Sequence, residues 1–271
     1  MTLFNTGFHN IHFEDQPSPL VVAPEVNGQP LPQINPAVAF PTITSDSAYT
    51  GGDVNSGLPV DPAAPPFFSL VMDVEPGTYR YMCDVHPGMA GVITVVADDV
   101  AIPGITEVSA EASSELASHV GAAMGELNAI LAGMGDMSSD GLTIQTGNGE
   151  STPATINQFF PFAATVKVGE SVTWSIPANG VEPHTVAWPA VYGQDVAPIP
   201  VDNAPPILGL GPSIAPMTPS DSSVGQGDVF QSGLFFPGQS FTLTFTEPGL
   251  YPYACTIHPG MSGTIQVLPA E

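Results

Sequence analysis

Short stretches of alternating hydrophobic and polar residues recur along most of this chain. They read FFSLVMDVEPGTYRYMC at 67–83, TVKVGESVTW at 165–174, SFTLTFTEPGLYPYAC at 240–255 and SGTIQVL at 262–268. Alternation with a period of two predicts half-buried β-strands, and turn signals such as EPG, PGM and VGE separate the stretches. Several short strands with Pro/Gly-rich connections predict a Greek-key β-sandwich in each half, so the expected fold class is all-β.

One stretch breaks this pattern. Between Glu107 and Leu131, apolar residues follow one another at steps of three and four, which places them on one face of a helix: Val108, Ala112, Leu116, Val120, Met124, Leu127 and Leu131. Glycines and small polar residues up to Gly141 are expected to end this helix. We predict a helix over about 107–131 that packs on the flank of a domain or, alternatively, binds a partner.

The chain contains an internal repeat. Gly, Tyr, Cys, His, Pro and Met recur in register between two nineteen-residue blocks, and two shorter blocks upstream of each also match in the same order. Three matched blocks in one order indicate a duplicated unit. The blocks are GTYRYMCDVHPGMAGVITV (77–95) with GLYPYACTIHPGMSGTIQV (249–267), GGDVNSGL (51–58) with GDVFQSGL (227–234), and HNIHF (9–13) with HTVAW (184–188).

The repeat predicts a first domain at 1–97, a helical linker at 98–141 and a second domain at 142–271. The second copy carries the strands around FFPFAATVKVGESVTW ahead of His184, whereas only eight residues precede His9. We therefore expect the first domain to lack its N-terminal strands in this sequence, unless another segment fills the gap. A region upstream that supplied them would also be able to carry an export signal or a lipid anchor.

Charge excludes several classes of function. The chain has 26 acidic residues and only two basic ones, Arg80 and Lys167, for a net charge of −24. So few cations cannot neutralise a nucleic-acid backbone or an anionic lipid surface. Together with an apolar fraction of 43%, the acidic excess favours a salt-adapted, halophilic protein over an ordinary acidic extracytoplasmic one. The sequence shows neither a transmembrane segment nor a signal peptide.

Each copy of the repeat holds one cysteine in the pattern Cys-x2-His-x2-Met. An upstream histidine can supply a fourth group, which gives His9, Cys83, His86 and Met89 in the first copy and His184, Cys255, His258 and Met261 in the second. Two histidines, a thiolate and a distant axial thioether are the ligand set of a blue-copper electron-transfer site. Methionine is not a usual ligand of zinc, which prefers cysteine, histidine and carboxylates. The alternative is that the methionines only pack in the core and the histidines only lie in turns. That interpretation does not explain why the same set of residues occurs twice.

The remaining polar residues near the motifs need separate assignments. His12 competes with His9, but the second copy has Ala187 at the position of His12, and positions three apart in a strand face opposite sides. We therefore expect His9 to be the ligand and His12 to point away. We interpret His119, on the predicted helix, as a surface residue. Asp84, beside Cys83, is expected to lower the reduction potential of the first site relative to the second.

The segment YACTIHPGM, with PHTV upstream, resembles the copper-binding signature of the cupredoxins, close to the plastocyanin, amicyanin and halocyanin group. The short loop between His and Met resembles the amicyanin type. This resemblance covers roughly 1–97 and 142–268, and it implies a Greek-key sandwich with copper near one end. It also implies that His86 and His258 lie near the surface as electron ports, that the partners are redox proteins, and that the location is extracytoplasmic, in the periplasm or at the cell surface.

Two cupredoxin-like units in one chain also resemble multicopper oxidases and copper nitrite reductases, which need a second kind of copper centre. No His-x-His occurs here, Met82 and Ala254 precede the cysteines, and only two of the six histidines remain after four serve the blue sites. We expect an electron carrier whose two type 1 coppers cycle between Cu(II) and Cu(I), and not an enzyme. The alternatives are an oxidase or nitrite reductase-like enzyme, and a copper storage or delivery protein.

Overall fold

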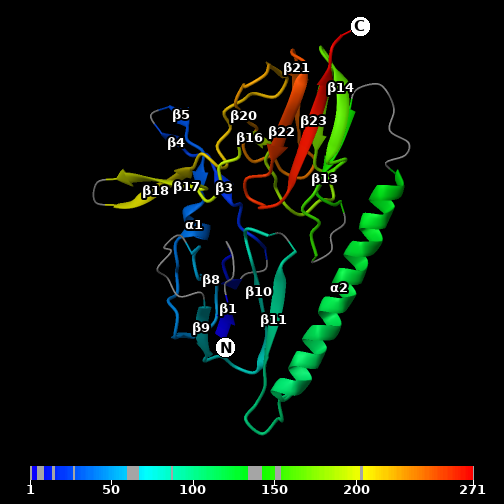
Figure 1. Ribbon diagram of the computed structural model, residues 1–271. Coiled ribbons are helices and arrows are strands. Elements are labelled where there is room, and N and C mark those ends of the chain that lie inside the picture. Colours follow the sequence, from blue (N-terminus) through cyan, green and yellow to red (C-terminus); the bar gives the residue numbers. More distant parts are fainter. Residues whose placement is uncertain are drawn as a thin grey trace. The chain divides into compact units, whose positions relative to one another are not determined.

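The computed structural model describes residues 2–4, 9–13, 16–26, 28–59, 67–86, 88–133, 142–149, 154–201 and 204–270. These residues form β-strands and two helices, α1 (Pro36–Ala39) and α2 (Ile105–Gly133), which confirms the all-β class (Figure 1). Contacts divide the chain into a first unit, Met1–Ser114 with Pro198–Gly209, and a second unit, Glu115–Ala197 with Leu210–Glu271. The boundaries 1–97, 98–141 and 142–271 stay a prediction, and residues 134–141 of that linker lie outside the described residues.

The second unit is a sandwich of two sheets, each with five strands among the described residues. The strand orders are β13-β12-β15-β21-β19 and β14-β23-β22-β16-β20, and Figure 1 shows β14 beside β23. The strands are β12 (Leu142–Thr146), β13 (Phe159–Phe160), β14 (Ala163–Lys167), β15 (Ser171–Ser175), β16 (Ala187–Trp188), β19 (Ser222–Val224), β20 (Phe230–Gln231), β21 (Ser240–Phe245), β22 (Gly249–Ala254) and β23 (Ser262–Leu268).

The apolar side chains of the alternating stretches fill the space between these sheets. Along β21, Phe241, Leu243 and Phe245 are buried while the residues between them are not. Trp174 is fully buried and meets Tyr253 of the other sheet edge-on, with ring centroids 5.1 Å apart. Each such side chain contributes roughly 1.5–3 kcal/mol by leaving water. Cys255 and Met261 belong to the same core cluster, so the predicted metal ligands lie at one end of a well-packed core.

The first unit repeats part of this sandwich. Its sheets have the orders β1-β9-β7 and β11-β10-β2-β8, and β10 pairs with β11 in the register that β22 and β23 use. Among the described residues, these two sheets contain no counterpart of β12, β13 or β14, as expected from the short segment ahead of His9. The strands are β1 (Thr2–Phe4), β2 (His12–Phe13), β7 (Ser47–Tyr49), β8 (Val54–Asn55), β9 (Phe67–Met72), β10 (Gly77–Met82) and β11 (Ala90–Val95).

The smaller sandwich has a smaller core. Its cluster of buried residues consists of Phe13, Tyr49 and Leu70, surrounded by side chains that are only partly buried. Proline-rich segments add short strands outside the sandwich, among which β18 pairs with β6 at Gly209 and Gln33. These strands are β3 (Val21–Val22), β4 (Glu25–Val26), β5 (Gln29–Pro30), β6 (Gln33–Ile34), β17 (Val196–Val201) and β18 (Ala204–Leu210).

Helix α2 begins and ends two residues beyond the predicted bounds. Glu107 lies in its first turn and accepts a hydrogen bond from the backbone N–H of Gly104, at the end of the helix where a negative charge is favourable. No residue of α2 is buried, so the expected packing of its apolar stripe on a domain flank is not observed. Within the second unit, Glu126 of this helix accepts hydrogen bonds from Asn148 Nδ2 and the N–H of Gly149, and Ala123, Leu127 and Ile130 are partly buried. No described helix combines the length and apolar character needed to cross a membrane.

Candidate metal centres

Three side chains converge at one end of the second sandwich. Cys255 follows β22, His258 lies in the turn between β22 and β23, and His184 precedes β16. The Sγ atom of Cys255 lies 3.8 Å from Nδ1 of His184 and 3.5 Å from Nδ1 of His258, and the two Nδ1 atoms are 3.1 Å apart. Segments about seventy residues apart in the chain therefore present one sulfur and two nitrogens to a single point.

Sγ of Cys255 and the two histidine Nδ1 atoms form a triangle whose size fits a metal ion. A triangle with sides of 3.1, 3.5 and 3.8 Å has a point in its plane about 2.0 Å from all three corners. Bonds from zinc to nitrogen and sulfur, as a guide to similar metals, measure roughly 2.0–2.3 Å. The donor set of one thiolate and two imidazoles suits copper, and a thioether nearby suits Cu(I) in particular.

The loop that carries the second motif is closed by its own backbone. The N–H of Cys255 donates to the carbonyl of Met261 at 2.9 Å, and the N–H of Met261 donates to the carbonyl of His258 at 3.1 Å. Gly260 has φ of +95°, a conformation that other residues rarely adopt, so glycine permits this turn. The Met261 side chain is 1% exposed and lies in the same core cluster as Cys255, which places it on the inner side of the loop.

His184, the predicted upstream ligand, is held in place by its neighbours. His184 exchanges two backbone hydrogen bonds with Phe235, and its side chain is buried. Gly147, with φ of +71°, lies against the ring, and a Cβ atom there would collide with Nε2 of His184. The absence of a side chain at Gly147 therefore leaves room for the ring to direct Nδ1 toward Cys255.

The charges around Cys255 in the second unit favour its thiolate form. Burial raises the pKa of Cys255, but hydrogen bonds and charges from His184 and His258 outweigh it and lower the pKa to about 5. Burial lowers the pKa of His258, whereas Cys255 and Glu182 raise it, to a net value of about 9. The N–H of Thr185 also points at Sγ of Cys255, at 3.4 Å. Because a metal binds the thiolate, this environment prepares the sulfur as a ligand.

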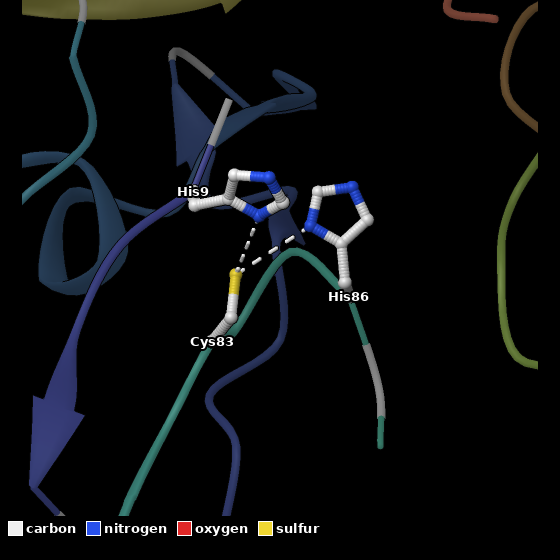
Figure 2. Close-up of side chains that lie close together, drawn as sticks. All are labelled: His9, Cys83 and His86. Atoms are coloured by element: carbon white, nitrogen blue, oxygen red, sulfur yellow. Dashed lines mark hydrogen bonds between the residues drawn. The ribbon is translucent and has the colours of Figure 1, made fainter. Parts of the chain in front are cut away.

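The first unit contains the equivalent group (Figure 2). Sγ of Cys83 lies 3.8 Å from Nδ1 of His9 and 3.5 Å from Nδ1 of His86, the same two distances as in the second unit. The backbone hydrogen bonds that close the loop, from Cys83 to Met89 and from Met89 to His86, also recur. Burial raises the pKa of Cys83 more than nearby backbone N–H groups lower it, and the charge of Asp84 adds to the rise.

The two groups differ at the predicted axial ligand. Met89 is 49% exposed, whereas Met261 is 1% exposed. The described part of the first unit also lacks the strand that leads to Gly147 in the second. The structure thus brings His9, Cys83 and His86 together but leaves the side chain of Met89 half in solvent.

His12 lies outside the metal-ligand group of its unit. Its ring is buried between two carboxylates, with Nδ1 2.9 Å from Oδ2 of Asp84 and Nε2 2.8 Å from Oδ1 of Asp53. Asp84 also accepts hydrogen bonds from Asn10 Nδ2 and the N–H of Ser18. Burial lowers the pKa of His12, but the hydrogen bonds and charges of Asp84 and Asp53 outweigh it and raise the pKa. His119 is partly buried on α2.

Sequence reasoning missed the polar residues that support the ligands. Glu182 contacts His258 and Asn10 binds the carboxylate of Asp84, yet neither residue matches between the two copies of the repeat. The only available signal was their position, within two residues of a predicted histidine ligand. Among the described residues, no other group of three or more His, Cys, Asp or Glu side chains converges as these two groups do.

Comparison with known proteins finds a family match within the second unit. Residues 148–268, somewhat less than half of the chain, match the profile of copper binding proteins of the plastocyanin/azurin family. The second unit is a cupredoxin. The amicyanin of Paracoccus versutus is similar to this chain at 24% identity, over 50% of this chain and 88% of that one, with a TM-score of 0.29. A reduced amicyanin variant and a Cu(I) form of another are similar at 23% and 22% identity, over 50% of this chain and 89% of each, with TM-scores of 0.28.

Proposed function

We propose that this protein is an electron carrier with two type 1 copper sites. The observation that carries the proposal is the repeated convergence of one cysteine Sγ with two histidine Nδ1 atoms at 3.5 and 3.8 Å. Copper bound there would accept and return one electron by alternating between Cu(II) and Cu(I). His9, Cys83, His86 and Met89 would hold it in the first unit, and His184, Cys255, His258 and Met261 in the second.

The surroundings of these residues favour electron transfer over catalysis. In the second site the backbone-closed loop and the buried Met261 restrict movement of the ligands when the charge of the metal changes. The loop histidines His86 and His258 are partly exposed, which suits their proposed role as electron ports for redox partner proteins. By the family resemblance, these partners and this protein would be extracytoplasmic, and the excess of acidic residues would suit a salt-rich environment.

The competing enzyme function needs a further copper centre. Of the two histidines outside the proposed blue sites, His12 has carboxylates at both ring nitrogens and His119 lies on α2. Neither belongs to a converging group of His, Cys, Asp or Glu side chains among the described residues. Storage or delivery of copper is a second alternative, supported by the exposed Met89 of the first site.

Reconstitution with Cu(II) tests these functions. A carrier becomes intensely blue, is bleached by one electron per copper, and recovers its colour on reoxidation without loss of metal. Sustained consumption of oxygen or nitrite would favour the enzyme, and transfer of the copper to a weak chelator during one redox cycle would favour delivery. A colourless protein that binds zinc in preference to copper would contradict the proposal.

A further inference from the structure

A carboxylate lies on the side of His258 that faces away from the proposed metal. Oε2 of Glu182 is 3.0 Å from Nε2 of His258, and the two side chains are only 10% and 14% exposed. The other ring nitrogen, Nδ1, is the atom directed at Cys255 and His184. The imidazole is therefore held between a carboxylate on one side and the ligand atoms on the other.

The chain places this carboxylate by a short, stiff connection. Glu182 lies two residues ahead of His184, and the residue between them is the buried Pro183. Proline fixes φ, so one segment positions both a ligand and a carboxylate that contacts the other histidine. A carboxylate that is largely buried is costly unless it is paired, and the chain offers only two Lys and Arg residues as cations. The contact with His258 is thus a specific arrangement and not a solvated surface pair.

The first copy of the repeat has no acid at this position. Aligning His9 with His184 puts Gly7 where the second copy has Glu182. In the described part of the first unit, Asp84 is a buried carboxylate that follows Cys83 and is shared by His12, Asn10 and Ser18. Asp84 thus contacts His12, Asn10 and Ser18, whereas Glu182 contacts His258, a proposed ligand.

Metal-bound histidines commonly donate their second ring N–H to a carboxylate, which fixes the tautomer and strengthens the histidine as a donor. We propose that Glu182 is a positioning residue that keeps the proton of His258 on Nε2, leaves Nδ1 free for copper, and stabilises Cu(II) relative to Cu(I) in the second site. This inference rests on the proposed function. Reduction adds one electron from a redox partner to the copper, and it neither forms nor breaks a bond to Glu182.

The two acids differ in what their charges contact. Asp84 was expected to lower the potential of the first site, but hydrogen bonds from His12, Asn10 and Ser18 offset part of its charge. Glu182 acts on a ligand itself. Each acid is thus expected to lower the potential of its own site, and the order of the two potentials stays a prediction.

The test uses the full chain with Cys83→Ser, so that only the second site takes up copper. Glu182→Gln keeps the size and an acceptor oxygen but removes the charge, and Glu182→Ala removes both. Glu247→Gln is the matched control, because Glu247 lies in the turn at the far end of the six-residue strand β22. That end is on the order of 20 Å from Cys255. The ratio of Cu(I) to Cu(II) is measured in one fixed redox buffer, together with the NMR signal of the His258 Nε2–H in the Cu(I) form.

We expect the Cu(I) to Cu(II) ratio to rise about tenfold in Glu182→Ala and less in Glu182→Gln, since loss of such a partner typically changes metal affinity by 10–100-fold. The Nε2–H signal should exchange faster with solvent in both variants, and Glu247→Gln should match the parent. Blue copper with an unchanged ratio in both Glu182 variants would overturn the inference and leave the copper function standing. Failure of the Cys83→Ser parent to form blue copper would overturn the proposed function as well.

Discussion

Nδ1 of His12 lies 2.9 Å from Oδ2 of Asp84, the residue that follows Cys83. The second unit has a different network in the corresponding place, where Thr256 and Thr185 share a hydrogen bond at 2.8 Å. One copy of the duplicated unit therefore supports its cysteine with a charged pair, and the other supports it with hydroxyl groups.

Removing Asp84 should destabilise the first unit far more than removing Asp53, although both contact His12. The side chain of Asp84 is fully buried, whereas that of Asp53 is 64% exposed. Breaking a buried pair leaves an uncompensated charge and costs roughly 3–5 kcal/mol, while an exposed pair contributes about 0–1 kcal/mol. Asp84→Ala and Asp53→Ala are compared by denaturant unfolding of the metal-free chain. Equal losses of unfolding free energy would contradict the assigned role of Asp84.

The stability of the first unit should depend on pH through His12. Its pKa is raised in the folded protein, because Asp84 and Asp53 outweigh the effect of burial. The resulting stabilisation is fully present below the unfolded-state pKa of about 6.5 and is lost as the pH rises through the folded value. Thermal unfolding of the metal-free protein, followed from about pH 5 to about pH 9, should show this loss in the wild type. A His12→Gln variant with the same pH profile as the wild type would refute it.

The two cysteines should ionise at different pH in the metal-free protein. The pKa of Cys255 is lowered to about 5, because the hydrogen bonds and charges of His184 and His258 outweigh burial, whereas burial and Asp84 raise the pKa of Cys83. Thiolate absorption in the ultraviolet, measured on Cys83→Ser and Cys255→Ser, assigns each transition. We expect the protein that retains Cys255 to titrate at the lower pH and to keep its copper in more acidic buffer. Superimposable titration curves would argue against these two environments.

Truncating the two motif methionines should have unequal effects on stability. Met261 is almost completely buried, so Met261→Ala creates a cavity and should cost roughly 2–5 kcal/mol in the metal-free protein. Met89 is half exposed, and Met89→Ala should change stability by less than about 0.5 kcal/mol. Denaturant unfolding of both variants checks the difference. Equal losses of stability in the two variants would contradict this prediction.

Periodicity and repetition predicted the architecture because they are local signals. Phe241, Leu243 and Phe245 alternate with polar residues, and that pattern alone places β21 on the core. The repeat paired His9 with His184 and Cys83 with Cys255, and both groups converge in the structure. The bounds of α2 were also predicted within two residues, since its stripe and terminal glycines are encoded in one continuous segment.

The supporting contacts were not predictable, because they depend on how distant segments meet. Glu182 reaches His258 across seventy-six positions of the chain, and no spacing rule connects them. The exposed side chain of Met89 follows from its surroundings and not from the spacing Cys-x2-His-x2-Met, since both copies share that spacing. The apolar stripe of α2 predicted burial, yet most of its residues are exposed, while the polar Glu126 makes hydrogen bonds within the second unit.

Copper stoichiometry tests the central claim most directly. The wild-type chain, Cys83→Ser and Cys255→Ser are titrated with Cu(II) while the blue thiolate-to-copper absorption is recorded, and bound copper is then measured after removal of the excess. The account predicts two coppers per chain in the wild type and one in each variant, every one of them blue, because each unit holds one Cys–His–His group. Copper bound without blue colour, or a wild type that binds as much blue copper as one of the single-cysteine variants, would contradict it.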